Sequence, residues 1–344
     1  MNPETLPLLV GIPGAVLTAD DRTLLETVRP AGVILFSRNV LHPGQVRDLV
    51  RAVRELPWEP LVAVDLEGGL VNRFEALWGA LPSPAAAASA GRRAVRALGE
   101  AAGAACRALG VELDLAPVVD VSVEGGLLDR QARCFSDDPD RVAALAGVFL
   151  DGLHAWGVGG CVKHFPGLGP VPEDTHETLP ELPAGAGAAI HEAPFRAAAE
   201  AAGAVMMAHV RTPDAPDPTL PASLDPTAVA RAAELPGRPV VLSDDLDMGA
   251  LAGFGTIPEL TEAALAAGNH GALICRSWES LPEVAAHLAG RAHAGSGFRA
   301  RLEDATARLL TRVRDLRLAF TAEPAPDDET VAQLWERARR EAGR

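Results

Sequence analysis

The chain contains no tyrosine, and aromatic residues make up only 4% of it. No tyrosine can therefore act as an acid or a nucleophile, so any chemistry must come from other side chains. Cysteine is also scarce, and the four cysteines form no Cys-x-x-Cys pair: Cys106, Cys134, Cys161 and Cys275. This spacing predicts no metal site. A chain of this size needs no disulfides, so we expect reduced thiols and a cytoplasmic location.

Positive charge and long apolar runs are lacking as well. Lys and Arg number 31 against 46 Asp and Glu, which gives a net charge of −15. This balance argues against nucleic acid or an anionic membrane surface as a partner, because both attract positive charge. No apolar run is long enough to span a bilayer. Glu4 stands where a signal peptide would carry positive charge, so we expect no export signal.

Short, unbroken apolar runs recur along the 344 residues, and a helix-like segment follows each of them. Such runs are typical of buried parallel strands, whereas strands with one wet face alternate. We predict eight strands, at Pro7–Val10, Gly32–Phe36, Leu61–Asp65, Glu112–Pro117, Gly160–Lys163, Ala204–His209, Pro239–Ser243 and Ala272–Cys275.

Eight alternations of strand and helix favour a single-domain α/β (β/α)₈ TIM barrel. A doubly wound open sheet is the alternative, but no Gly-x-Gly-x-x-Gly motif follows the first strand. We expect the barrel to occupy residues 1–320. Residues 321–344 are expected to form a linker and a C-terminal helix, near Thr330–Arg340, that packs on or beside the barrel.

Ionisable residues follow six of the eight predicted strands. In a (β/α)₈ enzyme the active site lies at the carboxyl ends of the strands, so these side chains are expected to meet at one mouth. They are Asp65, Asp114, Asp120, Lys163, His164, His209, Asp244, Asp245 and Arg276. A single carboxylate after a strand is often only a helix cap, but capping does not account for the whole set.

Several motifs resemble those of the bacterial β-N-acetylglucosaminidases of glycoside hydrolase family 3. KHFPGLG (Lys163–Gly169) is followed by Asp174-Thr175-His176, and SDDLDM begins at Ser243. The remaining matches are GVILFSRN (32–39), VDLEGGLVNRF (64–74), DLAPVVDV (114–121) and RCFSDDP (133–139). The resemblance runs through nearly the whole chain in the family's order.

The resemblance implies a retaining mechanism in which Asp244 is the nucleophile and an Asp174–His176 dyad is the acid/base. An imidazole with an ordinary pKa of about 6.5 suits a group that donates a proton and later accepts one. Asp174 is expected to orient the ring. Gly167 and Gly169 are expected to let this loop move.

The same motifs imply that five side chains bind the sugar: Asp65, Arg133, Lys163, His164 and His209. For His209, a buried core histidine is an equally good interpretation. No cofactor is expected. The expected partner is a carbohydrate, either a GlcNAc-containing muropeptide handled in peptidoglycan recycling or a chito-oligosaccharide. We expect a monomer or weak homodimer.

Four positions depart from the family pattern. Leu66, Leu70 and Leu168 replace a Gln, an Arg and a second His, and His270 replaces an Asp. We expect the chemistry to survive and the specificity to differ, and we expect Leu70 to remove a charge that supports Glu67. Two alternatives therefore stay open: a family 3 β-glycosidase or phosphorylase of other specificity, and a catalytically weakened sugar-binding homologue.

Overall fold

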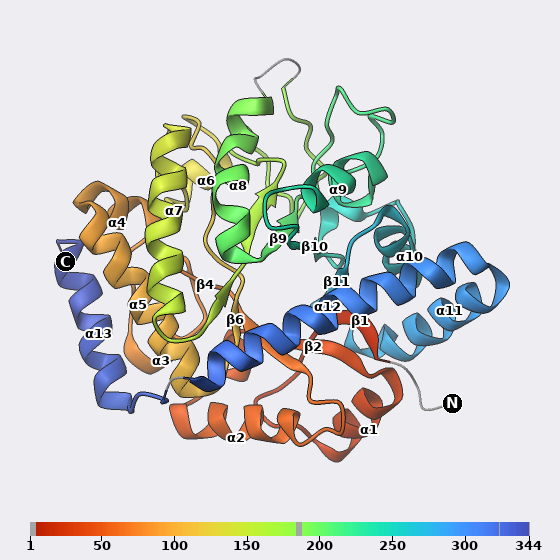
Figure 1. Cartoon of the computed structure of the whole chain (residues 1–344), viewed down its shortest axis with the longest axis horizontal. Coiled ribbons are helices and arrows are strands. Elements are labelled where there is room, and N and C mark those ends of the chain that lie inside the picture. The colour runs from red at the N-terminus through yellow and green to blue at the C-terminus, as the bar shows by residue number, and fades with distance from the viewer. Residues whose placement is uncertain (1–4, 184–187, 323, 344) are drawn as a thin grey trace.

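The computed structural model describes residues 5–183, 188–322 and 324–343, and it is a closed α/β barrel (Figure 1). Its main sheet has nine parallel strands in the order β7-β6-β3-β2-β1-β11-β10-β9-β8. The bounds are β1 Leu6–Gly11, β2 Pro30–Leu35, β3 Leu61–Val64, β6 Leu113–Asp114, β7 Gly159–Gly160, β8 Val162–Phe165, β9 Ala204–Met207, β10 Val240–Asp245 and β11 Gly271–Ile274.

The ring closes through the predicted fifth strand. Only Cys161 separates β7 from β8, so one short segment pairs with β6 on one side and with β9 on the other. The Cys161 N–H also donates to the Ala116 carbonyl at 2.9 Å. The eight predicted strands are thus present, and the open doubly wound sheet is wrong.

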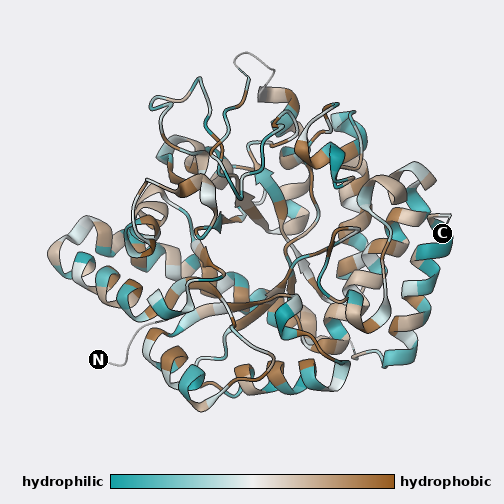
Figure 2. Ribbon diagram, turned by 180° about the vertical axis from the view of Figure 1, so that it is seen from behind, coloured by the Kyte–Doolittle hydropathy of each residue, from teal (hydrophilic) through white to brown (hydrophobic). Residues whose placement is uncertain are grey.

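Successive residues of a strand face two different cores. On β3, Val62 and Val64 belong to the layer between strands and helices, whereas Leu61 and Ala63 face the barrel interior. Both faces are dry, which explains why the strands are apolar throughout. In Figure 2 most of the strand residues are brown, and teal residues gather on the outer faces of the helices.

Most predicted helices are present around the ring. Thr18 caps the first of them through a capping box with Asp21. The stretch from Pro84 to Leu109 forms two helices, because Gly91 has a φ of 106° and ends the first. The bounds are α1 Ala19–Val28, α2 Pro43–Arg54, α3 Glu75–Trp78, α4 Pro84–Ala90, α5 Arg92–Leu109, α6 Leu127–Arg130, α7 Pro139–His154, α8 Ala188–Ala202, α9 Pro226–Ala233, α10 Ile257–Ala267 and α11 Leu281–Ala294.

Two further helices end the chain. Helix α12 (Ser296–Ala322) is absent from the prediction, and its Leu309, Val313 and Leu316 complete the interior core of the barrel. Helix α13 (Asp328–Glu341) packs against α5. The boundary at residue 320 stays a prediction. No helix within the described ranges is long and apolar enough to cross a membrane.

Candidate active site

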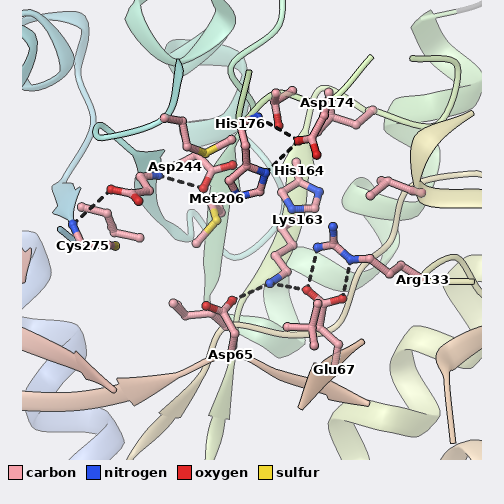
Figure 3. Close-up of a pocket in the computed structure, with 18 of the residues that line it drawn as sticks. Asp65, Glu67, Arg133, Lys163, His164, Asp174, His176, Met206, Asp244 and Cys275 are labelled. Atoms are coloured by element: carbon pink, nitrogen blue, oxygen red, sulfur yellow. Dashed lines mark hydrogen bonds and ion pairs between the residues drawn. The ribbon is translucent and has the colours of Figure 1, made fainter. Parts of the chain in front are cut away.

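A cavity of about 360 Å³ opens at the carboxyl ends of the strands (Figure 3). A small antiparallel hairpin, β4 (Leu66–Gly68) and β5 (Val71–Asn72), extends β3 at its rim. Seven of the eight predicted site residues line the cavity: Asp65, Arg133, Lys163, His164, Asp174, His176 and Asp244. The eighth, His209, contacts the end of β10 instead.

Four charged side chains form a continuous ion cluster on one wall. The Lys163 Nζ lies 2.7 Å from Asp65 Oδ1 and 2.6 Å from Glu67 Oε1. The Arg133 guanidinium donates to both oxygens of Glu67, at 2.8 Å each. Such a two-pronged contact fixes the plane of the guanidinium. The N–H groups of Arg133 and Lys163 that do not contact a carboxylate can then face hydroxyl or amide groups of a ligand.

Glu67, Arg133 and Lys163 keep their charges despite being buried. Burial raises the pKa of Glu67, but Arg133 and Lys163 outweigh it and hold that pKa well below its usual range. Burial likewise lowers the pKa of Lys163, and Asp65 and Glu67 more than reverse this. Because each buried charge depends on its partners, loss of one would leave another uncompensated.

Asp244 lies at the end of β10 with its carboxylate toward the cavity. Burial raises its pKa, but His209, His164, the Asp245 N–H and Lys163 hold that pKa below its usual value. The Asp245 N–H donates to Asp244 Oδ1 at 2.8 Å. Asp244 is therefore ionised at neutral pH, as a carboxylate nucleophile must be.

The neighbouring Asp245 is held differently. It accepts hydrogen bonds from the backbone N–H groups of Asp247 and Cys275, at 3.1 Å each. Burial, with repulsion from Asp247, raises its pKa to about 6. These contacts tie the end of β10 to the end of β11, so Asp245 has a structural role.

His209 is buried and bridges two elements. Its Nδ1 lies 2.7 Å from Ser223 Oγ, and its Nε2 lies 3.0 Å from the Asp245 carbonyl, to which it donates. Burial lowers the pKa of His209, and the nearby Asp244 carboxylate partly offsets this effect. These contacts agree with the interpretation of His209 as a buried core histidine. The hydrogen bond to the Asp245 carbonyl helps to hold the turn that follows β10.

Asp174 and His176 lie on the loop after β8, within hydrogen-bonding distance of each other. Asp174 Oδ1 lies 2.8 Å from His176 Nδ1 and also accepts from the His176 backbone N–H at 2.9 Å. Burial raises the pKa of Asp174, but the contacts with His176 together outweigh this and hold that pKa below its usual value. With Nδ1 bound to the carboxylate, Nε2 is the ring atom left for a substrate, and Figure 3 shows His176 beside Asp244.

His164 is oriented by Asp120, a carboxylate that the sequence analysis expected at the barrel mouth without giving it a role. Asp120 is fully buried, and its Oδ2 lies 2.8 Å from His164 Nδ1 and 3.1 Å from the His164 backbone N–H. Its Oδ1 accepts from the Leu168 N–H at 2.6 Å. One side chain therefore holds both the His164 ring and the start of the loop.

Gly169 lies in close contact with that same segment. A Cβ atom at this position would overlap the Val121 carbonyl oxygen, so only glycine fits. The loop continues with a hydrogen bond from the Leu127 N–H to the Val171 carbonyl at 2.7 Å. Here Gly169 permits close packing, and its use as a hinge stays a prediction.

The four residues that depart from the family pattern occupy different places relative to the cavity. Leu66 is in the core, and Leu168 is a buried residue on the cavity wall. Leu70 is 73% exposed on the β4–β5 turn, and Glu67 already has two cationic partners, so the expected loss of support for Glu67 is wrong. His270 is buried away from the cavity, and its Nδ1 accepts from the Val241 N–H at 3.0 Å.

Glu67 and Asp120, the two carboxylates that organise the predicted binding residues, received no role in the sequence analysis, although Asp120 was expected at the barrel mouth. Both lie in the quoted motifs, VDLEGG and DLAPVVDV, which was the available signal. Within residues 5–183, 188–322 and 324–343, no group of three or more His, Cys, Asp or Glu side chains is arranged to hold a metal ion.

Known proteins are similar in sequence to this chain over most of its length. Residues 10–312 match the family described as "Glycosyl hydrolase family 3 N terminal domain". A protein named Beta-hexosaminidase from Xylella fastidiosa (strain 9a5c) is 38% identical over 296 residues, which covers 83% of this chain and 87% of that protein. A protein of the same name from Pseudomonas aeruginosa (strain LESB58) is 37% identical over 280 residues, or 78% and 82% of the two chains.

Solved structures agree with this relationship. NagZ from Neisseria gonorrhoeae, in complex with N-trifluoroacetyl-D-glucosamine, superposes with a TM-score of 0.81 at 28% identity, covering 99% of both chains. A glycoside hydrolase family 3 β-N-acetylglucosaminidase from Paenibacillus sp. str. FPU-7 gives a TM-score of 0.84 at 28% identity, covering 98% of this chain and 67% of that one. The chain therefore belongs to glycosyl hydrolase family 3, and it is a glycoside hydrolase built on a single (β/α)₈ barrel.

Proposed function

We propose that this protein is a retaining exo-β-N-acetylglucosaminidase. The observation that carries the proposal is the meeting of an ionised Asp244 and an Asp174–His176 pair at one small cavity. The relatives named Beta-hexosaminidase and the solved β-N-acetylglucosaminidases support the choice of sugar. The preferred substrate is a GlcNAc-containing fragment of peptidoglycan, and a cytoplasmic setting is part of the proposal.

In the first step Asp244 attacks the anomeric carbon. The bond from this carbon to the leaving-group oxygen breaks, and His176 donates its Nε2 proton to that oxygen. The sugar is then esterified to Asp244. Asp174 stabilises the imidazolium before the transfer and keeps Nδ1 protonated after it, in the manner of a Ser-His-Asp triad.

In the second step His176 acts as the base. Its Nε2 accepts a proton from a water molecule, whose oxygen attacks the anomeric carbon from the side that the leaving group vacated. The ester bond to Asp244 breaks, and the sugar leaves with its original configuration. Two inversions give net retention.

The ion cluster and the neighbouring His164 are suited to hold the sugar during both steps. Asp65 can accept hydrogen bonds from hydroxyls, and Arg133, Lys163 and His164 can donate to hydroxyls or to the acetamido carbonyl. A cavity of about 360 Å³ is at the small end of the range for ligand sites. This size suits one terminal sugar, which agrees with an exo-acting enzyme.

The test is release of 4-nitrophenol from the N-acetyl-β-glucosaminide and from the β-glucoside, each with and without phosphate. We expect phosphate-independent turnover of the N-acetyl sugar, and we expect Asp244→Ala to abolish it. Turnover that requires phosphate and releases sugar 1-phosphate would indicate a phosphorylase instead. Binding of GlcNAc without turnover would indicate the weakened sugar-binding homologue.

A further inference from the structure

The loop that carries Asp174 and His176 is bound directly to the turn that follows the nucleophile. The Gly249 N–H donates to the His176 carbonyl at 3.0 Å, and the Ala250 N–H donates to the Thr175 carbonyl at 3.1 Å. Both donors belong to a short 3₁₀ helix, η3 (Gly249–Leu251), that begins only five residues after Asp244. The two halves of the proposed catalytic apparatus are therefore linked by two hydrogen bonds.

Residue 249 must be glycine for this contact to form. A Cβ atom there would lie 2.5 Å from the His176 carbonyl oxygen and 3.1 Å from the Glu177 carbonyl oxygen. Both neighbours are backbone atoms, so neither can rotate away as a side-chain tip would. Any larger residue must push the loop, and with it the imidazole, away from the nucleophile.

The turn that presents Gly249 is itself firmly held. The Asp245 carbonyl accepts from the Met248 N–H at 3.1 Å and from His209 Nε2 at 3.0 Å. The Asp247 Oδ2 accepts from the backbone N–H groups of Arg276 and Ser277, at 2.6 and 3.1 Å. The turn is thus fixed to the end of β11 and can serve as a rigid seat for the loop.

We propose that Gly249 and Ala250 are positioning residues, whose backbone N–H groups set the place of the Asp174–His176 dyad relative to Asp244. This inference rests on the proposed roles of Asp244 and His176. Rates of general acid–base catalysis depend steeply on geometry, and a displacement of about 1 Å can cost roughly 100-fold. The predicted consequence is a selective loss of acid/base function.

The test compares Gly249→Ala with Gly290→Ala, where a Cβ atom would meet nothing within 4 Å. On an alkyl N-acetyl-β-glucosaminide, whose leaving group needs a proton, Gly249→Ala is expected to lose roughly 100-fold in kcat. With the 2,4-dinitrophenyl glycoside and azide, neither step needs the dyad. The dinitrophenolate leaves without a proton in the first step, and in the second step azide attacks the anomeric carbon without a base and displaces Asp244. The variant is expected to recover here and to yield the glycosyl azide, whereas Gly290→Ala should match the wild type throughout.

Equal losses on both substrates, with no recovery in azide, would overturn the inference and indicate a general defect of the fold. Wild-type rates for Gly249→Ala on the alkyl glycoside would overturn it as well. Hydrogen exchange supplies a second test that needs no turnover. The Gly249 and Ala250 amides of the wild type should exchange slowly, and rapid exchange would contradict the proposed contact. A wild type that cleaves no sugar but shows slow exchange at these amides would instead contradict the proposed function.

Discussion

At the scale of single residues, the site depends on carboxylates that never need to touch the sugar. Glu67 holds Arg133 and Lys163, and Asp120 holds His164 and the Leu168 N–H. Each of these carboxylates is buried and uses both oxygens. A side chain that orients two or more groups at once is hard to replace, because a substitute must satisfy all of its partners.

Asp120→Asn tests this point with little change in shape. An amide offers only one acceptor oxygen, so its NH₂ group must face either the His164 N–H groups or the Leu168 N–H. We expect kcat/KM to fall roughly 10- to 100-fold, which corresponds to about 1–3 kcal/mol for an unsatisfied buried group. KM should rise and inhibition by free GlcNAc should weaken, while kcat should change less. Steady-state kinetics measures all three.

Asp137→Asn is the matched control, because Asp137 is an exposed carboxylate on the same stretch of chain. It should leave both constants unchanged. A normal KM in Asp120→Asn, with normal inhibition by GlcNAc, would show that His164 needs no such support.

At the scale of elements, the sequence predicted the barrel better than it predicted what closes it. Unbroken apolar runs identify strands with two buried faces, so the sequence pattern was enough to predict all eight strands. Helix α12 also left a signal, since its buried residues Ala305, Leu309, Val313, Leu316 and Phe320 recur every three or four positions. Its place under the barrel follows only from packing.

The candidate site was predictable for residues that resemble family motifs and less so for their supports. Asp244, Asp174 and His176 stand out because a motif surrounds each of them. The roles of Glu67 and Asp120 depend on which side chains the folded barrel brings next to them, and sequence spacing does not give those neighbours. The contact of Gly249 with His176 joins two segments that are far apart in the chain, so no local pattern predicts it.

The joint between β10 and β11 provides a prediction about stability. Burial lowers the pKa of His270 to about 4, from an ordinary value near 6.5, while its Nδ1 accepts from the Val241 N–H. A group whose pKa is lowered by folding adds stability that is complete above its unfolded pKa and is lost as the pH falls through the folded value. Here the loss should develop between about pH 6.5 and 4.

We therefore expect the wild type to lose about 2 kcal/mol more unfolding free energy than His270→Asn between pH 7 and pH 5. The asparagine Oδ1 can accept the same hydrogen bond and does not titrate. Urea unfolding at the two pH values measures the difference, with the exposed His293→Asn as control. Parallel losses in wild type and His270→Asn would mean that His270 does not titrate as its burial implies.

At the scale of the whole molecule, stability and chemistry occupy opposite ends of the barrel. Helix α12 completes the apolar core at one end, and the charged cavity opens at the other. The chain has a net charge of −15, yet five cationic side chains line the cavity: Arg38, Arg73, Arg133, Lys163 and Arg276. Six carboxylates line the cavity as well, so Asp244 stays ionised through its own neighbours, Lys163 among them. The whole account depends on that ionisation.

The most direct test of that account is to trap the sugar on Asp244. In His176→Ala, the 2,4-dinitrophenyl N-acetyl-β-glucosaminide can still react, because its leaving group needs no acid, but the ester should persist because no base activates water. Mass spectrometry of the acid-quenched, digested protein should find an N-acetylhexosaminyl adduct on Asp244. An adduct on another residue, or wild-type turnover by His176→Ala with no adduct, would contradict the mechanism.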